Sequence, residues 1–135
     1  VSAWNPGELC RMALPPCHFA FQCYVRESKY LDLQMHMRSI DTGLGLPYNI
    51  ASYAALTHLL AGLTSYLPGK LFITFGDLHI YSDHLDALYE QMDRTPRRLP
   101  ELTIRHIATL DDVTPDIFQL HGYDPYDPIP MKMAV

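Results

Sequence analysis

The strongest constraint in this sequence is a strict alternation of apolar and polar residues between Tyr30 and Arg38. The apolar positions are Leu31, Leu33, Met35 and Met37, and the polar positions are Asp32, Gln34, His36 and Arg38. A repeat of two residues sends all the apolar side chains to one face of a β-strand. That face must lie away from water, in the core of one chain or in a contact between two chains.

A second strand is predicted just before it, over residues 18–26. Its apolar side chains share one face: Phe19, Phe21, Cys23 and Val25. The three residues between the strands, 27–29, suit a tight turn, so an antiparallel hairpin is expected. A turn near residues 27 and 28 places Cys17 nearly opposite Arg38, whereas a slip of one residue in the register moves them apart.

The rest of the chain mixes helices and strands without a strict alternation. We expect a helix over 48–66, a strand over 70–75, a helix over 82–94, a strand over 101–106 and a short strand within 116–122. The first helix is apolar around most of its circumference and is therefore predicted to be central and buried. This order of elements favours the α+β class over a doubly wound sheet.

Length and charge narrow the possible functions. A chain of 135 residues suffices for one domain, and a net charge of -5 argues against a general nucleic-acid-binding surface. A bound phosphate would have to be held by a few local positive charges. The sequence contains no run of about 18 apolar residues and no signal-peptide pattern near Val1, so we expect a cytoplasmic protein without a membrane partner.

Cys17 is the first candidate for chemistry. It follows Pro15 and Pro16, which stiffen the backbone that presents the thiol. A thiol acts as a nucleophile in its thiolate form, which a nearby cation stabilises, and Arg38 is the candidate cation. The three cysteines form no metal-binding pattern, and a buried structural cysteine remains the competing interpretation of Cys17.

Other polar side chains suggest a ligand. Arg38 and Ser39 suit a phosphate, because a guanidinium and a hydroxyl can both donate to its oxygens. Asn49 either caps the predicted helix or offers a donor and an acceptor to a pyrimidine base such as uracil. Three polar residues alternate on one face and could bind a sugar hydroxyl: Asp77, His79 and Tyr81. The spacing of His79 and His84 hints at a metal, but no third ligand is evident.

Seven short motifs together resemble the thymidylate synthase family, specifically its C-terminal half. They are Ser-Ala-Trp-Asn-Pro at 2–6, Met-Ala-Leu-Pro-Pro-Cys-His at 12–18, Arg-Ser-x-Asp-x-Gly-Leu-Gly-Leu-Pro-Tyr-Asn-Ile-Ala-Ser-Tyr at 38–53, Gly-Asp-x-His-Ile-Tyr at 76–81, Pro-Arg-x-Leu-Pro at 96–100, Gly-Tyr-Asp-Pro at 122–125, and the terminal Met-Ala-Val. The resemblance implies a mixed β-sheet packed with helices, with two such sheets stacked back to back in a homodimer. Residues 31–37 are then candidates for the dimer contact as well as for a core.

The resemblance also implies roles for individual residues. Cys17 matches the nucleophile that adds to C6 of dUMP, and Arg38 and Asn49 complete the expected catalytic set. The residues expected to bind dUMP are Arg38, Ser39, Asp41, Asn49, His79 and Tyr81. Those expected to bind the co-substrate 5,10-methylenetetrahydrofolate are Leu14, Asp41, Leu44, Gly45, Tyr48, Ala134 and Val135. The last two belong to a tail that closes over folate in this family, and no metal is expected.

Several features depart from the family pattern or leave alternatives open. Met37 stands where glutamine is usual, Tyr48 where phenylalanine is usual, and Phe75 where glycine is common. The family's N-terminal portion is not in this sequence, so we expect a fragment that is inactive alone or that needs a complementary N-terminal piece. A pyrimidine hydroxymethylase and a catalytically inactive binding module are the alternatives. Asn49 argues against a cytosine substrate, and the Met-Ala-Val tail favours the synthase.

Overall fold

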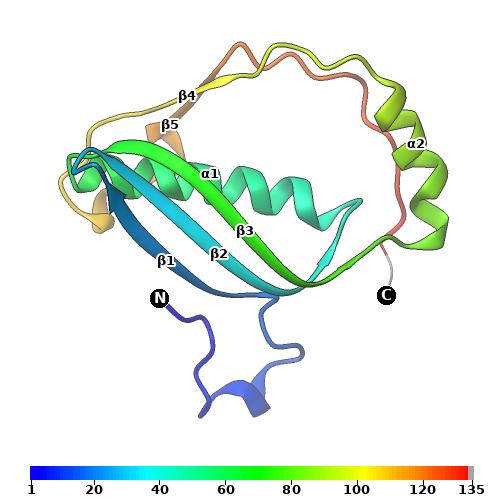
Figure 1. The fold of residues 1–135 in the computed structure, drawn as a ribbon, viewed down its shortest axis with the longest axis horizontal. Coiled ribbons are helices and arrows are strands. Elements are labelled where there is room, and N and C mark those ends of the chain that lie inside the picture. The colour runs from blue at the N-terminus through cyan, green and yellow to red at the C-terminus, as the bar shows by residue number, and fades with distance from the viewer. Residues whose placement is uncertain (134–135) are drawn as a thin grey trace.

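A three-stranded mixed sheet crossed by one long helix forms the centre of the computed structural model, which describes residues 1–133 (Figure 1). The sheet has the order β1-β2-β3 and consists of β1 (His18–Arg26), β2 (Tyr30–Asp41) and β3 (Leu67–His79). β1 pairs antiparallel with β2, and β2 pairs parallel with β3. A mixed sheet combined with helices confirms the predicted α+β class.

The hairpin between β1 and β2 turns where the sequence predicts. Arg26 pairs with Tyr30, and the N–H of Lys29 donates to the carbonyl of Arg26 at 3.1 Å. Glu27 and Ser28 have φ angles of 55° and 51°, in the left-handed region. Two consecutive left-handed residues give the turn whose twist matches that of the flanking strands, although glycine and asparagine are the residues that usually occupy it.

The apolar face of β2 forms the core of this chain. Leu33, Met35 and Met37 are buried with Ile40 in one cluster, and Leu31 is buried as well. Partly buried side chains from the neighbouring elements pack against this cluster: Phe21 from β1, Leu71, Ile73 and Phe75 from β3, and Leu46, Tyr53, Leu56 and Leu60 from the helix. These β2 side chains therefore belong to a core within one chain, and they are not available for a contact between two sheets.

Helix α1 (Gly45–Leu63) lies across this face of the sheet (Figure 1). It begins before the predicted start at residue 48, because Pro47 falls in the first turn, where its missing N–H costs no hydrogen bond. It ends at Leu63 and is followed by a left-handed Ser65, with the N–H of Tyr66 donating to the carbonyl of Ala61 at 2.8 Å, as in a Schellman motif.

The long helix is central, as predicted, but the prediction that it is buried is wrong for the described residues (Figure 1). Its buried residues are Thr57, Leu59 and Ala61, whereas Tyr48 is 76% exposed and Ile50 is 44% exposed. The sheet covers one side of the helix, and residues 1–133 leave much of the other side in contact with water.

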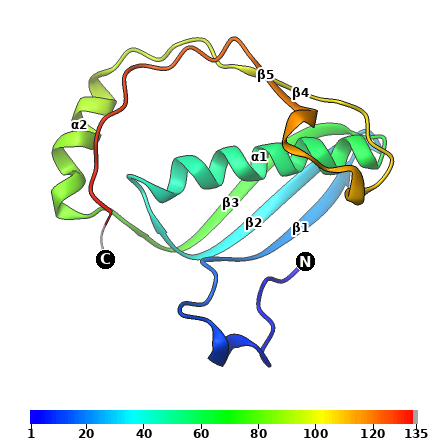
Figure 2. The ribbon, with the colours of Figure 1, turned by 180° about the vertical axis from the view of Figure 1, so that it is seen from behind.

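The second half of the chain is more open. A 3₁₀ turn (Ser82–His84) leads into α2 (Leu85–Asp93), and β4 (Glu101–Ile104) pairs antiparallel with β5 (Phe118–His121). Further 3₁₀ turns span Leu9–Arg11, Leu110–Asp112 and Pro115–Ile117. The segments between α2 and β4 and after β5 run side by side away from the main sheet, as both views show (Figures 1 and 2).

This arrangement exposes a large surface. The solvent-accessible area is 9770 Å², whereas a compact monomer of 15.4 kDa is expected to expose about 7,200 Å². In the described part of the chain, no helix combines the length and apolar character needed to cross a bilayer.

Candidate active site

Cys17 lies on a short backbone segment, residues 15–17, in which every carbonyl accepts a hydrogen bond. The carbonyl of Pro15 accepts from Nη2 of Arg38 at 2.7 Å, and that of Pro16 accepts from the indole N–H of Trp4 at 3.1 Å. The carbonyl of Cys17 itself accepts from the backbone N–H of Arg38 at 2.9 Å. The structure thus brings Cys17 and Arg38 together across the hairpin, and the free thiol is half-buried against the core.

Arg38 has donors beyond its bond to Pro15. Its Nε atom is buried and has no hydrogen-bond partner among the described residues. A buried guanidinium nitrogen without an acceptor is costly, so an anion that accepted from it would stabilise the site. The guanidinium of Arg38 therefore holds the segment of residues 15–17 and has a further donor with which it could bind a negatively charged group.

The parallel pairing of β2 and β3 joins two polar groups that lie far apart in the sequence. Ser39 pairs with Asp77, and Asp41 pairs with His79. Nδ1 of His79 lies 3.5 Å from a carboxylate oxygen of Asp77, and the ring of His79 meets that of Tyr81 edge-on at 5.2 Å. The expected sugar-binding and phosphate-binding residues therefore occupy one end of the sheet.

Asn49 lies within α1 and does not cap it. The helix begins at Gly45, and Asn49 Oδ1 lies 3.9 Å from the position that a Cβ on Gly45 would take. One turn later, on the same side of the helix, the hydroxyl of Tyr53 shares a 3.1 Å hydrogen bond with Nδ1 of His18. Since His18 directly follows Cys17, this side of the helix faces the end of the hairpin that carries the thiol.

Asp41 organises the loop between β2 and α1. Its two carboxylate oxygens accept from the N–H groups of Gly43 at 2.9 Å and Leu44 at 3.0 Å. Burial works to raise the pKa of this carboxyl. Hydrogen bonds from the backbone of residues 43–45, with a smaller contribution from His84, outweigh burial and lower the pKa below its usual value. The group is thus held as a carboxylate.

A pocket of about 630 Å³ opens beside this loop. It is lined by Asp41, Leu44, Gly45, Tyr48, Tyr81, Met131 and Met133. Four residues predicted to bind folate are therefore gathered in one cavity, and Tyr81 joins them although it was expected at the sugar. Leu14 is 67% exposed and does not line the pocket, while Ala134 and Val135 lie outside the described residues.

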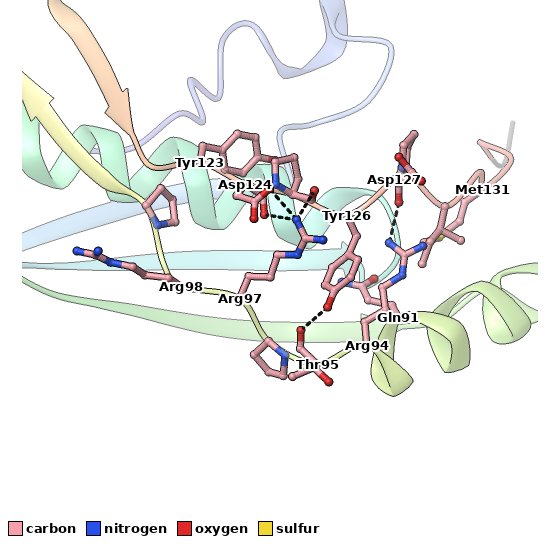
Figure 3. Close-up of a pocket in the computed structure, with 15 residues that line it drawn as sticks. Gln91, Arg94, Thr95, Arg97, Arg98, Tyr123, Asp124, Tyr126, Asp127 and Met131 are labelled. Atoms are coloured by element: carbon pink, nitrogen blue, oxygen red, sulfur yellow. Dashed lines mark hydrogen bonds and ion pairs between the residues drawn. The ribbon is translucent and has the colours of Figure 1, made fainter.

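Before it reaches this pocket, the C-terminal tail is held by a set of contacts around Tyr126, which Figure 3 shows. The guanidinium groups of Arg97 and Arg94 lie 3.9 Å and 5.3 Å from the centre of its ring. Its hydroxyl donates to the carbonyl of Thr95 at 3.1 Å, and Arg94 donates to the carbonyl of Asp127 at 2.7 Å. We call these five residues the Tyr126 clasp; they border a second cavity of about 490 Å³.

Sequence reasoning missed two polar groups near the site, Tyr53 and His84. Tyr53 entered the sequence analysis only within the predicted apolar helix over 48–66, and His84 was considered only as a metal ligand beside His79. Residues 1–133 contain no cluster of three side chains of metal-binding type. No local sequence pattern could predict the hydrogen-bond partner of His84, because that partner is the carbonyl of Lys132, 48 residues further along the chain.

Comparisons with known proteins agree with the motifs. The family model described as thymidylate synthase matches residues 1–135. A probable thymidylate synthase of Escherichia phage T5 is 50% identical over 139 residues, which cover 99% of this chain and 50% of that protein. The thymidylate synthases of Homo sapiens and human herpesvirus 8 are each 48% identical over 136 residues, covering all of this chain and 43% and 40% of theirs. The chain spans about half the length, or less, of these relatives.

Proposed function

The chain belongs to the thymidylate synthase family, and from this premise we propose that it is the C-terminal catalytic portion of an enzyme that converts dUMP into dTMP with 5,10-methylenetetrahydrofolate. The observation that carries the proposal is the pairing of Cys17 with Arg38. The thiol lies on a backbone segment that Arg38 holds, and the Nε atom of this arginine is buried with no hydrogen-bond partner within residues 1–133.

The proposed reaction uses the thiolate of Cys17 as a covalent catalyst. Carbon C5 of uracil is a poor nucleophile, but addition of the thiolate at C6 makes an enolate that attacks the one-carbon unit of the folate. Loss of the C5 proton and release of tetrahydrofolate leave an exocyclic methylene on the base. Hydride from the tetrahydrofolate reduces this methylene to a methyl group, the thiolate departs, and dihydrofolate and dTMP result. Splitting one difficult step in this way is the general advantage of covalent catalysis.

Arg38, Ser39 and Asn49 hold dUMP in this proposal. Arg38 donates to the phosphate from the guanidinium nitrogens that the carbonyl of Pro15 does not use, and Ser39 adds a hydroxyl. Asn49, on the side of α1 that faces the thiol, offers both a donor and an acceptor to the uracil edge. Asp41 acts at the border between the dUMP and folate sites, while His79 and Tyr81 are assigned to the sugar.

The folate is assigned to the pocket beside the loop of residues 41–45. Tyr48 and Tyr81 supply aromatic walls, and Leu44 with Met131 and Met133 supplies apolar ones. Such a lining, with one carboxylate, suits a flat heteroaromatic ring that carries N–H donors. Asp41 belongs to this pocket and lies three positions after Arg38 on β2, about 10 Å along the strand, so the two proposed binding sites are neighbours.

The partners of the whole protein are part of the same proposal. Since α1 covers the face of β2 that carries Met35, a back-to-back contact between two sheets falls on the opposite face. There Tyr24 and Phe72 are 69% and 49% exposed. We assign a homodimer contact to this face, and we assign the remaining catalytic groups to a complementary N-terminal portion.

The test is covalent capture by 5-fluoro-dUMP. The chain, alone and mixed with the N-terminal portion of a full-length family member, is incubated with 5-fluoro-dUMP and 5,10-methylenetetrahydrofolate and examined by mass spectrometry. We expect a ternary adduct on Cys17 in the mixture, because fluorine at C5 cannot leave as a proton does. The adduct should vanish in Cys17→Ser and persist in Cys23→Ser.

Two results would contradict the proposal. Absence of any mass shift in the mixture would favour an inactive binding module. With dUMP in place of the inhibitor, 5-hydroxymethyl-dUMP formed without dihydrofolate would identify a hydroxymethylase.

A further inference from the structure

His84 is a fully buried imidazole that the proposed reaction does not use. It ends the 3₁₀ turn before α2, and its exposed fraction is 0%. Its Nε2 atom lies 2.6 Å from the carbonyl oxygen of Lys132. A carbonyl can only accept, so Nε2 carries the hydrogen and donates it to the tail. His84 therefore holds the tail one residue before Met133, the last residue described.

The other side of the imidazole faces the loop between β2 and α1. Nδ1 is buried without a hydrogen-bond partner among the described residues, and it lies 3.8 Å from a carboxylate oxygen of Asp41. A Cβ on Gly43 would lie 2.8 Å from Nδ1 and 2.9 Å from the sulfur of Met131. Only a residue without a side chain permits loop, imidazole and tail to approach this closely.

The segments that meet at His84 also form walls of the pocket assigned to folate. Asp41 lies in the wall formed by the loop, and Met131 and Met133 lie in the wall formed by the tail. Tyr81 lies in a third wall, and its ring is 5.5 Å from that of His84. His84 itself does not line the pocket. It lies behind the cavity and connects its walls.

We propose that His84 is a positioning residue for the co-substrate, which acts by fastening the tail to the loop of residues 41–45. The identity of the ligand rests on the proposed function, whereas the fastening does not. Loss of the donor releases the tail from the loop, and the pocket then loses its Met131 and Met133 wall. The affinity for folate falls while the affinity for dUMP is unchanged.

Trypsin tests the fastening without any ligand. The bond between Lys132 and Met133 contains the carbonyl that His84 holds, so cleavage there requires the tail to detach. Its rate is measured by mass spectrometry relative to cleavage after the exposed Arg98 in the same sample. Removal of a buried donor should raise the relative rate about threefold to tenfold, because proteolysis follows the population of the open form.

Four variants separate the hydrogen bond from packing. His84→Phe keeps a ring but has no donor, and it should cleave faster. His84→Gln offers an amide N–H in place of Nε2 and should stay near the unchanged protein. Gly43→Ala leaves His84 intact, but the added methyl group pushes against the imidazole and Met131. Trypsin should therefore cleave this variant faster as well. It replaces His84→Phe in the test if that variant does not fold. His106→Phe, at an exposed histidine, is the control for an added phenylalanine.

Calorimetric binding of 5,10-methylenetetrahydrofolate and of dUMP then tests the link to the site, with the N-terminal portion supplied. In His84→Phe we expect the dissociation constant for folate to rise about threefold to tenfold, while the dissociation constant for dUMP stays unchanged. In His84→Gln the dissociation constant for folate should be close to that of the unaltered protein. Equal cleavage rates in all variants would overturn the fastening. Faster cleavage with unchanged folate affinity would overturn the positioning role. If the unaltered protein binds no folate, the proposed function fails, whatever the trypsin result.

Discussion

At the scale of single residues, Asp41 combines a structural and a chemical task. Its carboxylate replaces the helix cap that Leu44 cannot provide, because it accepts from backbone N–H groups just ahead of α1. The same group borders the pocket assigned to folate. A change at Asp41 is therefore expected to alter the stability of the chain as well as ligand binding.

The lowered pKa of Asp41 predicts a specific dependence of stability on pH. A carboxyl whose pKa is lower in the folded than in the unfolded state stabilises fully above its unfolded value of about 4. This contribution is lost as pH falls through the folded value. We expect Asp41→Asn to reduce the free energy of unfolding by about 1–2 kcal/mol at pH 7. The difference from the unchanged protein should shrink below pH 4. Urea unfolding followed by circular dichroism at several pH values measures both, and a constant difference would contradict the assignment.

The amide of Asn49 leads to a prediction about the choice between uracil and cytosine. An ionised carboxylate has no donor for the O4 atom of uracil, whereas it can accept from the amino group of cytosine. We therefore expect Asn49→Asp to bind dUMP more weakly and to lose its preference for dUMP over dCMP, by about 1–3 kcal/mol for the exchanged hydrogen bonds. Competition binding with the two nucleotides measures the ratio. An unchanged ratio would mean that another side chain reads the base.

Residue placements could be predicted where the hairpin register determines them. Cys17 faces Arg38 because the turn falls at Glu27 and Ser28, and the alternation in β2 limits the register. The contact between His84 and Lys132 could not be predicted, since it depends on how the chain returns after β5. The sequence also left open whether Asn49 caps its helix, which depended on where the helix begins.

At the scale of elements, local patterns identified the main helices and strands, and both ends of β1, but missed one or both ends of the others. β3 extends beyond the predicted 70–75 in both directions, because pairing with β2 orders residues that have no apolar alternation of their own. The predicted helix over 82–94 divides into a 3₁₀ turn and α2, since His84 turns inward to meet the tail. Pairing between segments that are distant in the sequence determines where such elements end, and the strand and helix propensities of single residues do not predict that pairing.

The two faces of β2 predict contrasting effects of neighbouring substitutions. Met35 is fully buried under α1, so Met35→Ala should lower the free energy of unfolding by about 2–5 kcal/mol. Gln34 lies on the opposite face and donates to Thr74 at 3.0 Å, so Gln34→Ala should cost about 1 kcal/mol or less. Urea midpoints give both values. Equal losses would show that the face of β2 is assigned wrongly.

At the scale of the whole molecule, the chain is a sheet and helix with a distant arm. The arm comprises residues 94–104 and 118–131, which lead from α2 to the β4–β5 pair and back (Figures 1 and 2). Its internal contacts include those of the Tyr126 clasp, the ion pair of Arg97 with Asp124, and the pairing of β4 with β5. The arm was predicted only as two separate strands, because sequence motifs do not show how the segments that carry them are oriented relative to the sheet.

The clasp predicts that the arm opens separately from the sheet. Tyr126→Ala removes the ring on which Arg94 and Arg97 stack, together with the bond to Thr95. We expect amide hydrogen exchange to quicken about tenfold in residues 95–100 and 123–130. Tyr126→Phe retains the ring and should show a smaller effect. Exchange in β1–β3 should stay as in the unaltered protein, and uniform acceleration there would contradict separate opening.

The uncovered side of α1 has a thermal consequence. The heat capacity gained on unfolding comes mainly from apolar groups that enter water only when the chain unfolds. Tyr48 and Ile50 already contact water in the folded chain, as part of its large exposed area of 9770 Å². We therefore expect the gain per residue to fall below the approximately 12–15 cal/mol/K usual for closed domains. A small gain flattens the stability curve, and this chain should therefore be less prone to cold denaturation than a closed domain with the same midpoint and enthalpy of melting.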